Sequence, residues 1–337
     1  MPFTLAELDA ATELVHRSVT PTPTHRWPLL SEALGAEVWV KHENHTPTGA
    51  FKVRGGLVYV DRLMRERPEV RGLVSATRGN HGQSIAYAGA AAGLPVTICV
   101  PFGNSRDKND SMRGFGAELI EVGRDYQAAR EHAASLARER DYEYVPPFHP
   151  DLVLGVATYA RELFDAVGSL DVVYVPVGMG SGAAGLIGVR DLLGLSTEIV
   201  GVVSELAPAS ALSFAAGAVV ATETADTFAD GVACRVPEAD AIATLVAGAA
   251  RVIAVSEDGI AEAMRLLFAA THNAPEPAGA IALAGAVAEH DSIEGARIAV
   301  IHSGGNVDST MFAEVLRGAT PVVWPDARGV ELGGLGT

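Results

Sequence analysis

One lysine in this chain stands in a setting that suits covalent chemistry. Lys52 lies in TGAFKVRGG, between Gly49 and the pair Gly55-Gly56, and closely follows the apolar run EVWVK. A lysine acts as a nucleophile near pH 7 only when burial favours its neutral form, and Phe51 beside it offers a flat apolar face for an aromatic cofactor. Most lysines are simply solvated, so it is the surrounding sequence that makes Lys52 a candidate.

Three glycine-rich loops are further candidates for ligand binding, and each follows an apolar run. They are SATRGNHGQS at 75–84, PVGMGSGAAG at 176–185 and HSGGNVDS at 302–309. In the second loop, successive backbone N–H groups and the start of a helix can surround a phosphate. The same stretch satisfies the loose dinucleotide pattern GxGxxA, with Glu205 where a ribose-binding acid would stand. A nicotinamide-dependent dehydrogenase and a plain packing turn therefore stay open as alternatives.

Short β-branched runs alternate along the chain with longer Ala- and Leu-rich stretches of helical period. This alternation is typical of βαβ units that build a parallel sheet, so the predicted fold class is α/β. The predicted strands are 37–41, 72–75, 96–100, 118–122, 172–177, 199–203 and 297–301. The predicted helices include 82–92, 126–139, 152–167, 183–193, 257–270 and 277–289. Ligands bind beyond the carboxyl ends of strands in such sheets, which is where the three loops lie.

Four motifs occur here in a defined order: TGAFKVRGG, then GNHG at 79–82, GMGSG at 178–182 and SGGNVD at 303–308. In this order the chain resembles the serine/threonine dehydratase and serine racemase family, which belongs to the fold type II pyridoxal-phosphate enzymes, similar to the tryptophan synthase β chain. The resemblance runs from about Thr20 to Arg317. It implies two open, mostly parallel α/β lobes with the cofactor in the cleft between them. It also favours a single phosphate over a dinucleotide in the glycine-rich loop.

The resemblance implies a role for individual residues. Lys52 corresponds to the lysine that holds pyridoxal 5'-phosphate as a Schiff base, Phe51 to the residue stacked on its ring, and Asn80 to the partner of its phenolic oxygen. Ser303 would bond the pyridine nitrogen, and Glu276 in EPAGA matches an acid near the ring edge. The residues that would cradle the phosphate are Gly178, Met179, Gly180, Ser181 and Gly182. Those that would receive the substrate carboxylate are Thr77, Arg78, Gly79 and His81.

These roles imply β-elimination from a β-hydroxy amino acid such as L-threonine or L-serine, which yields a 2-oxo acid and ammonia. The cofactor would absorb the electrons left when the α-proton departs, and Lys52, displaced as a free amine, would take that proton. A serine does not hold the ring nitrogen protonated as a carboxylate does, so loss of the hydroxyl is favoured over transamination. Dehydration of 3-hydroxyaspartate or phenylserine, racemisation of serine and a non-catalytic, cofactor-bound sensor stay as alternatives.

Two positions depart from the family pattern and bear on the substrate. Arg78 stands in the carboxylate loop where relatives often carry small residues, and its guanidinium suits the α-carboxylate, a second carboxylate on the substrate, or solvent. His45 stands where relatives often carry Leu, so it is a hypothetical contact to the substrate side chain or the leaving hydroxyl, with a structural role as the alternative. Asp230 and Gly231 match a family stretch written ADG and are interpreted as a structural turn.

No metal site is expected. Some family members bind a divalent cation through a Glu and an Asp, and Val203 and Ala209 occupy those two positions here, so the ligands of a hard cation are missing. His42 and His45 share a short segment but lack the further ligands of a zinc site.

Composition limits the partners and the location. The 337 residues carry a formal charge of -16, which disfavours nucleic acid as a partner. No apolar stretch is long enough to span a bilayer, so we expect a cytoplasmic enzyme that binds a small amino-acid substrate and no membrane. A homodimer is expected by resemblance and on base rates. The expected domains are 1–73 with 151–320 as a large cofactor-binding domain, 74–150 as a small mobile domain, and 321–337 as a C-terminal tail.

Overall fold

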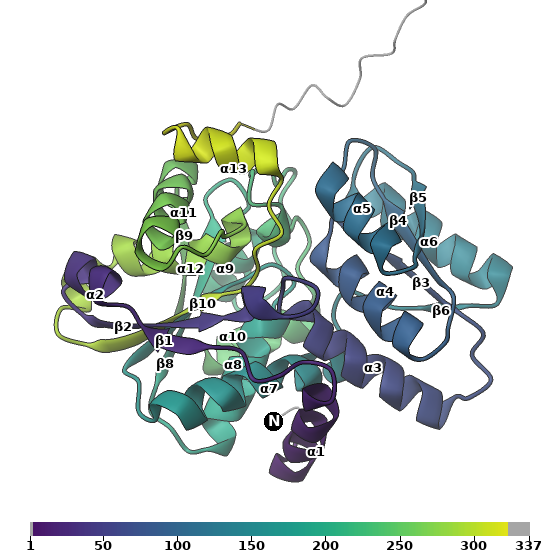
Figure 1. The fold of residues 1–337 in the computed structure, drawn as a ribbon, viewed down its shortest axis with the longest axis horizontal. Coiled ribbons are helices and arrows are strands. Elements are labelled where there is room, and N and C mark those ends of the chain that lie inside the picture. Colours follow the sequence, from purple (N-terminus) through teal and green to yellow (C-terminus); the bar gives the residue numbers. More distant parts are fainter. Residues whose placement is uncertain (1–2, 323–337) are drawn as a thin grey trace, which may run out of the picture.

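Two β-sheets of unequal size organise the chain (Figure 1). The computed structural model describes residues 3–322, so the tail expected at 321–337 lies, beyond Val322, outside the described residues. The larger sheet takes strands from the first and last parts of the sequence, and the smaller sheet takes its strands from the segment between them.

The larger sheet has six strands, and all neighbouring pairs are parallel except the first. In spatial order they are β1 (Thr24–Arg26), β2 (Glu37–His42), β10 (Arg297–His302), β7 (Val172–Pro176), β8 (Glu198–Ser204) and β9 (Arg251–Val255). Parallel neighbours need long crossover connections, and these connections supply the helices that cover both faces of the sheet.

Two helical layers cover the larger sheet. One layer comprises α1 (Leu5–His16), α7 (Pro150–Val167), α8 (Ser181–Leu192) and α10 (Ala239–Gly248). The other comprises α2 (Pro28–Leu34), α11 (Glu257–Thr271) and α12 (Pro277–Ala288). On β7, Val173 and Val175 pack in the core under the first layer, whereas Val172 and Tyr174 pack in the core under the second. This separation follows from the two-residue period of a strand.

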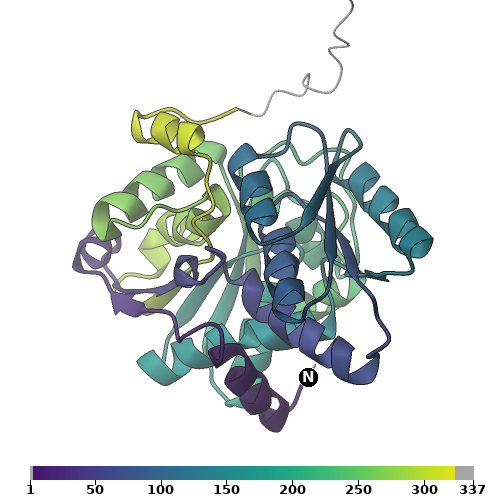
Figure 2. The same ribbon diagram turned by 45° about the vertical axis from the view of Figure 1, so that its right-hand side comes forward.

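The smaller sheet has four parallel strands and lies beside the larger one (Figure 2). In spatial order they are β5 (Glu118–Glu121), β4 (Val96–Val100), β3 (Leu73–Ala76) and β6 (Glu143–Tyr144). The helices of this unit are α4 (Asn80–Ala91), α5 (Arg106–Gly114) and α6 (Tyr126–Arg140). Leu73 and Ile98 face the core that contains α4, whereas Val74 and Cys99 face α6, so this sheet is also covered on both faces.

Helix α3 (Lys52–Glu66) packs against both α4 and α7 and so connects the two sheet units (Figure 1). Glycine allows this close approach. A Cβ atom on Gly55 would lie 2.7 Å from the carbonyl oxygen of Leu152, and one on Gly56 would lie 2.9 Å from that of Ser84. The Gly-Gly pair that follows the lysine motif is therefore required by helix packing.

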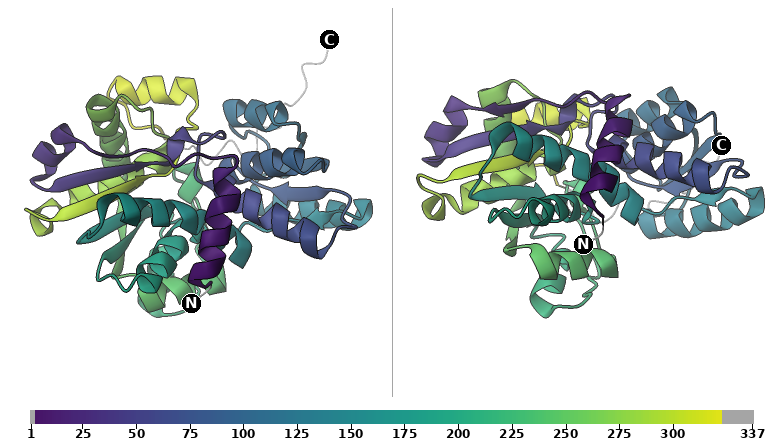
Figure 3. Two further views of the ribbon diagram at one scale, coloured as in Figure 1. Left: turned by 60° about the horizontal axis from the view of Figure 1, so that its bottom comes forward. Right: turned by 90° about the horizontal axis from the view of Figure 1, so that it is seen from below.

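The remaining elements are short. They are α9 (Ala209–Ala216), α13 (Ser309–Leu316), and the 3-10 helices η1 (Glu43–His45), η2 (Asp230–Val232) and η3 (His290–Ser292). At the other end of the chain, Thr4 and Glu7 form a capping box at the start of α1. Helix α1 then lies across α7 and α3, as Figure 3 shows. Within residues 3–322, no helix has both the length and the apolar character needed to cross a membrane.

The predicted α/β class is confirmed. All seven predicted strands and all six predicted helices are present, with ends that differ by one or two residues. The sequence analysis missed β1, β6 and β9. The first two are short, with three and two residues, and most of β9 is only partly buried.

Candidate active site

Most of the chemistry-bearing loops meet at one edge of the larger sheet. The segments before Lys52, before α8 and after β10 all leave the carboxyl ends of β2, β7 and β10, which are adjacent parallel strands. The loop before α4 reaches the same place from the smaller sheet. Together they line a pocket with about 930 Å³ of empty space, solvent at its mouth included. The predicted site residues that line it are Phe51, Lys52, Thr77, Arg78, Gly79, Asn80, His81, Gly178, Met179, Gly180, Ser181, Gly182, Glu276 and Ser303.

A tight turn ahead of α3 positions Lys52. The hydroxyl of Thr46 accepts a hydrogen bond from the N–H of Ala50 at 3.0 Å and donates one to the carbonyl oxygen of Ala50 at 2.8 Å. The N–H of Phe51 then donates to the carbonyl oxygen of Ser303 at 3.1 Å. The lysine is therefore anchored through its backbone neighbours to the loop that follows β10.

Lys52 is half-buried, and its amine has no carboxylate partner among residues 3–322. Its Nζ atom donates to Oγ of Ser181 at 2.9 Å and lies 4.9 Å from the centre of the Phe51 ring. Burial lowers the pKa of Lys52 from its ordinary 10.5 to about 8, because the ammonium loses hydration. A useful fraction of the amine is therefore neutral near pH 7, as a nucleophile or a base requires.

The loop between β7 and α8 forms a cradle for an anion. Gly180 adopts a φ of +88°, in the left-handed region that favours glycine, immediately before α8 begins. The first N–H groups of a helix have no partner within it, so those of α8 are available to a phosphate. A Cβ atom on Gly178 would lie 2.5 Å from the carbonyl oxygen of Gly231, and the Tyr159 hydroxyl donates to the carbonyl oxygen of Gly182 at 2.9 Å. These contacts hold the cradle in place.

Asn80 and Glu276 form a polar pair on another wall of the pocket. Nδ2 of Asn80 donates to Oε1 of Glu276 at 2.6 Å, and Oδ1 of Asn80 accepts from Nδ2 of Asn306 at 2.9 Å. Glu276 is only 1% exposed. Burial raises the pKa of Glu276 above its ordinary value, and the ammonium of Lys108, 3.3 Å from Oε2, offsets part of that effect.

The loop from Thr77 to His81 opens α4 at the mouth of the pocket. Oγ1 of Thr77 accepts from the N–H of Gly79 at 2.9 Å, which fixes the turn. Burial, together with the nearby charge of Lys52, lowers the pKa of His81 to about 3, so the imidazole is neutral. Arg78 is half-buried in the pocket wall and forms no hydrogen bond or ion pair with residues 3–322. Its guanidinium is therefore available to an anionic ligand.

His45 does not line the pocket, which favours its structural role over the hypothetical contact to the substrate. Its side chain is exposed, its ring packs 5.7 Å from that of His42, and Nε2 lies 2.6 Å from Oδ1 of Asn273. These contacts hold the imidazole away from Lys52. In the described part of the chain, no three His, Cys, Asp or Glu side chains are grouped so as to hold a metal ion.

Four titratable side chains of the pocket were not predicted as site residues. They are Lys108, Tyr126, Asp230 and Cys234. Asp230, which was interpreted only as part of a turn, lies 2.6 Å from Nζ of Lys108. One signal pointed to Lys108, since it follows β4 at the carboxyl edge of a parallel sheet. Its immediate neighbours do not distinguish it from a solvated lysine.

The residues present fit pyridoxal phosphate, the cofactor that the sequence resemblance implies. The glycine-rich loop offers backbone N–H groups for a phosphate, and Lys52 offers an amine for an aldehyde. The same pocket holds the hydroxyl of Ser303, which donates to the carbonyl oxygen of Ala278 at 3.2 Å, and the amide of Asn80.

Comparisons with known proteins agree with this chemistry. A family profile described as "Pyridoxal-phosphate dependent enzyme" matches residues 15–304. The L-threo-3-hydroxyaspartate ammonia-lyase of Saccharomyces cerevisiae is 30% identical over 312 residues, which cover 92% of this chain and 95% of that protein. The biosynthetic L-threonine dehydratase of Salmonella typhimurium is 33% identical over 298 residues, which cover 87% of this chain but only 58% of that protein.

A solved structure shows the same fold. The processed form of threonine deaminase isoform 2 from Solanum lycopersicum matches with a TM-score of 0.87 and 29% sequence identity, over 94% of this chain and 92% of that one. The profile match, the identity to these relatives and the shared fold each cover most of this sequence. The chain therefore belongs to the family of fold type II pyridoxal-phosphate dependent enzymes.

Proposed function

We propose that this chain removes water from a small β-hydroxy amino acid and releases a 2-oxo acid and ammonia, with pyridoxal phosphate held by Lys52. The observation that carries the proposal is the Lys52 amine, which lies beside a glycine-rich anion cradle, has a lowered pKa and has no carboxylate partner among residues 3–322. The names of the matched relatives, a hydroxyaspartate ammonia-lyase and a threonine dehydratase, support the same class of reaction.

Lys52 is the proposed covalent anchor and the proposed base. When bound, pyridoxal phosphate supplies an electron sink for the pair left on the α-carbon of the substrate. After the amine of the substrate has displaced it, Nζ of Lys52 is neutral and accepts the α-proton. As an ammonium, the same nitrogen can return a proton to the departing β-hydroxyl, which leaves as water. The released enamine then takes up water to give the 2-oxo acid and ammonia.

The other predicted residues have binding and orienting roles in this proposal. Backbone N–H groups of 178–182 would bind the phosphate, and the ring of Phe51 would support the pyridine ring. Ser303 would bond the pyridine nitrogen, and Asn80, held by Glu276, would bond the phenolic oxygen. A hydroxyl does not keep that nitrogen protonated, as a carboxylate would, so the electrons left on the α-carbon are less stabilised. Prompt loss of the β-hydroxyl is then favoured over transamination.

The loop 77–81 is proposed to receive the substrate. Its backbone N–H groups at the start of α4, together with Thr77, Gly79 and His81, suit the α-carboxylate. Arg78 lacks an acidic partner among residues 3–322, so its guanidinium suits a second carboxylate through two parallel hydrogen bonds. This observation favours 3-hydroxyaspartate as a candidate alongside L-threonine and L-serine, and the name of the yeast relative supports the same choice.

We further propose that residues 74–150 form a small mobile domain that closes over a large domain made of 1–73 and 151–320. Closure would exclude water from the pocket and bring the loop 77–81 onto the substrate carboxylate. A cytoplasmic homodimer is the proposed state, because two-fold dimers are the commonest soluble oligomers. Small-angle scattering with and without substrate tests the closure, and sedimentation tests the dimer.

The function is tested by assaying the protein loaded with pyridoxal phosphate on a panel of β-hydroxy amino acids in both enantiomeric forms. We expect 2-oxo acid and ammonia from wild type, neither from Lys52→Ala, and a cofactor adduct at Lys52 after borohydride reduction and mass analysis. An adduct at another residue contradicts the proposal. A coloured protein that releases no 2-oxo acid would indicate a sensor, or a racemase if the substrate enantiomers interconvert.

The role of Arg78 is tested by Arg78→Ala on the same panel. Losing a hydrogen-bonded charge contact costs about 1.5 to 3 kcal/mol, so kcat/KM for 3-hydroxyaspartate should fall by about 10- to 100-fold while that for L-threonine changes little. An equal loss on every substrate would assign Arg78 to the α-carboxylate instead. Arg106→Ala is the matched control, because Arg106 is an exposed arginine on α5.

A further inference from the structure

Lys108 is a buried lysine that the proposed reaction does not use. It lies on α5, in the unit of the smaller sheet, but its ion-pair partners belong to the unit of the larger sheet. Its Nζ atom lies 2.8 and 2.6 Å from the two carboxylate oxygens of Asp230 on η2, and 3.3 Å from Oε2 of Glu276 at the start of α12. One ammonium therefore joins three elements across the pocket.

The ion pair leads directly to the polar pair described above. The Glu276 carboxylate accepts from Nδ2 of Asn80 through Oε1 and faces the Lys108 ammonium with Oε2. Asn80 is in turn fixed by Asn306. The side chain of Glu276 is thus held from two sides, by a cation from α5 and by an amide from α4.

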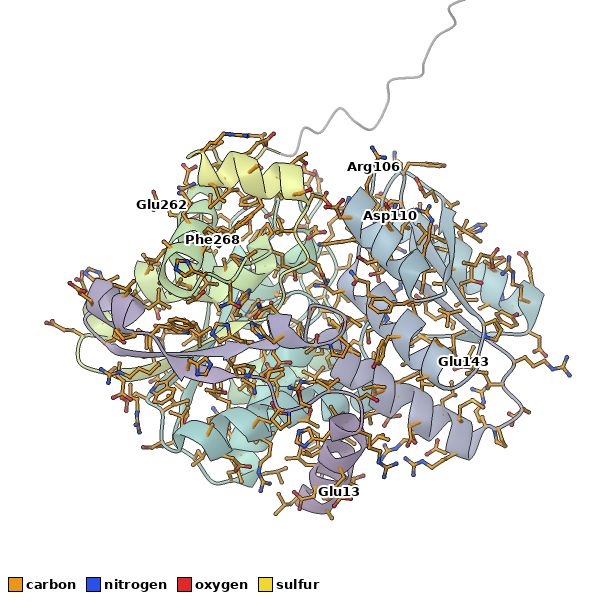
Figure 4. All side chains as sticks on the ribbon, viewed as in Figure 1. Glu13, Arg106, Asp110, Glu143, Glu262 and Phe268 are labelled. Atoms are coloured by element: carbon orange, nitrogen blue, oxygen red, sulfur yellow. The ribbon has the colours of Figure 1, made fainter. Side chains whose placement is uncertain are left out.

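The position of Lys108 is set by the way that α5 docks. Figure 4 labels Arg106 and Asp110, which lie on the exposed side of α5, whereas Lys108 between them is buried. The stem of Lys108 fills the space beside Gly79, where a Cβ atom would collide with it. The same end of α5 also contacts the start of α13, since Asp107 accepts from the N–H of Ser309 at 3.2 Å.

The charges of Lys108 and Asp230 shift the pKa of Glu276 in opposite directions. Although burial opposes its charge, the carboxylates of Asp230 and Glu276 hold the pKa of Lys108 above its ordinary value. For Glu276, burial raises the pKa most, Lys108 lowers it and Asp230 raises it. The other titratable groups that line the same pocket, Lys52, Arg78, His81, Tyr126 and Cys234, form no hydrogen bond or ion pair with Glu276 among residues 3–322.

We propose that Lys108 is a positioning residue that holds the Glu276 carboxylate against Asn80 and thereby couples the docking of α5 to the geometry of the cofactor site. The inference rests on the proposed contact between Asn80 and the phenolic oxygen of pyridoxal phosphate. Asp230 shares Lys108 with Glu276, so the two acids compete for one cation. Removing the cation and removing the competing acid must therefore change the ionisation of Glu276 in opposite directions.

The test is a pH titration of the visible absorbance of the holoenzyme, read in wild type, Lys108→Met, Asp230→Asn and Arg106→Met. The midpoint that belongs to Glu276 is the one that Glu276→Gln removes. An opposite charge at this range shifts a carboxyl midpoint by about 1 to 3 pH units, so Lys108→Met should raise the midpoint by that amount. Asp230→Asn should lower it, and Arg106→Met, which removes an exposed cation from the same helix, should leave it unchanged.

A purely structural role would not move the midpoint in opposite directions. Midpoints that stay at the wild-type value in both variants, or that move the same way in both, overturn the inference. If Lys108→Met does not accumulate as folded protein, the Asp230→Asn variant is the test. A Glu276 midpoint that this variant does not lower contradicts the competition for Lys108. A colourless wild type would overturn the proposed function as well, whereas a coloured, active protein with unchanged midpoints overturns this inference only.

Discussion

Replacing Lys52 by methionine should abolish activity and yet stabilise the protein without its cofactor. Folding removes the Lys52 ammonium from water, and no carboxylate among residues 3–322 compensates for that loss. Lys108 is the matched comparison, because it lines the same pocket but lies 2.6 Å from Asp230. The stabilities of the protein with Lys52→Met and with Lys108→Met should therefore change in opposite directions.

The size of the effect follows from the titration of Lys52. Its pKa falls from 10.5 to about 8 on burial, which corresponds to about 3 kcal/mol against folding at pH 7. The Phe51 ring, 4.9 Å from the ammonium, stabilises the folded state by about 1 kcal/mol through a cation–π contact, which offsets part of that cost. We expect Lys52→Met to raise the free energy of unfolding by about 2 kcal/mol, the difference between these two contributions.

The pH dependence of this gain has a definite sign. Below pH 8 the lysine is charged in both the folded and the unfolded state, so the burial cost is complete. Between about 8 and 10.5 the folded amine is neutral while the unfolded one is still charged, so the cost shrinks as the pH rises. Above 10.5 the amine is neutral in both states, and the advantage of Lys52→Met should vanish.

Urea unfolding of the cofactor-free proteins at pH 7 and at pH 10 measures both effects. Lys108→Met should lose about 3 kcal/mol at pH 7, because Asp230 and Glu276 lose their buried cation. The raised pKa of Lys108 keeps that contribution present up to pH 10. The reasoning is refuted if Lys52→Met unfolds at lower urea than wild type at pH 7, or if its advantage is as large at pH 10.

Three further outcomes are expected. Arg54→Met should lower the free energy of unfolding by about 3 to 5 kcal/mol in the same urea assay. Arg54 bonds Glu43 at 2.7 Å and Glu162 at 2.6 Å in a buried cluster. A loss of less than about 1 kcal/mol would contradict this reasoning. Gly178→Ala should weaken retention of pyridoxal phosphate, read as absorbance after dialysis, because its Cβ would lie 2.5 Å from the carbonyl oxygen of Gly231; full retention would be the contrary result. His45→Leu should leave the substrate profile unchanged, because His45 is exposed and bonds Asn273. A changed substrate preference would support a contact between His45 and the substrate.

Features with a local cause could be predicted from the sequence. The strands and helices were found because side chains alternate with the period of the element, as on β7. The glycine-rich loop before α8 was found because close backbone packing demands glycine, and Gly178 is packed against Gly231. The ordered motifs and the family resemblance identified fifteen site residues, and fourteen of them line one pocket.

Features that depend on distant segments could not be predicted. Lys108 and Asp230 are 122 residues apart in the sequence, and the neighbours of neither residue indicate that the two form an ion pair. The two roles considered for His45 could not be separated for the same reason, because its contact to Asn273 spans 228 residues. Strand β9 was missed because it is partly exposed at the sheet edge and so lacks a clear alternation.

The placement of carboxylates around each lysine determines which lysine can do covalent chemistry. Lys41 is fully buried, and its Nζ atom lies 2.5 Å from Glu162. Lys108 forms ion pairs with Asp230 and Glu276, so both Lys41 and Lys108 have carboxylate partners. Lys52 is the lysine of the three without an acid within ion-pair distance among residues 3–322. The packing of distant segments pairs the pocket carboxylates of Asp230 and Glu276 with Lys108 and so leaves the amine of Lys52 without an acid. The local motif around Lys52 does not encode this arrangement.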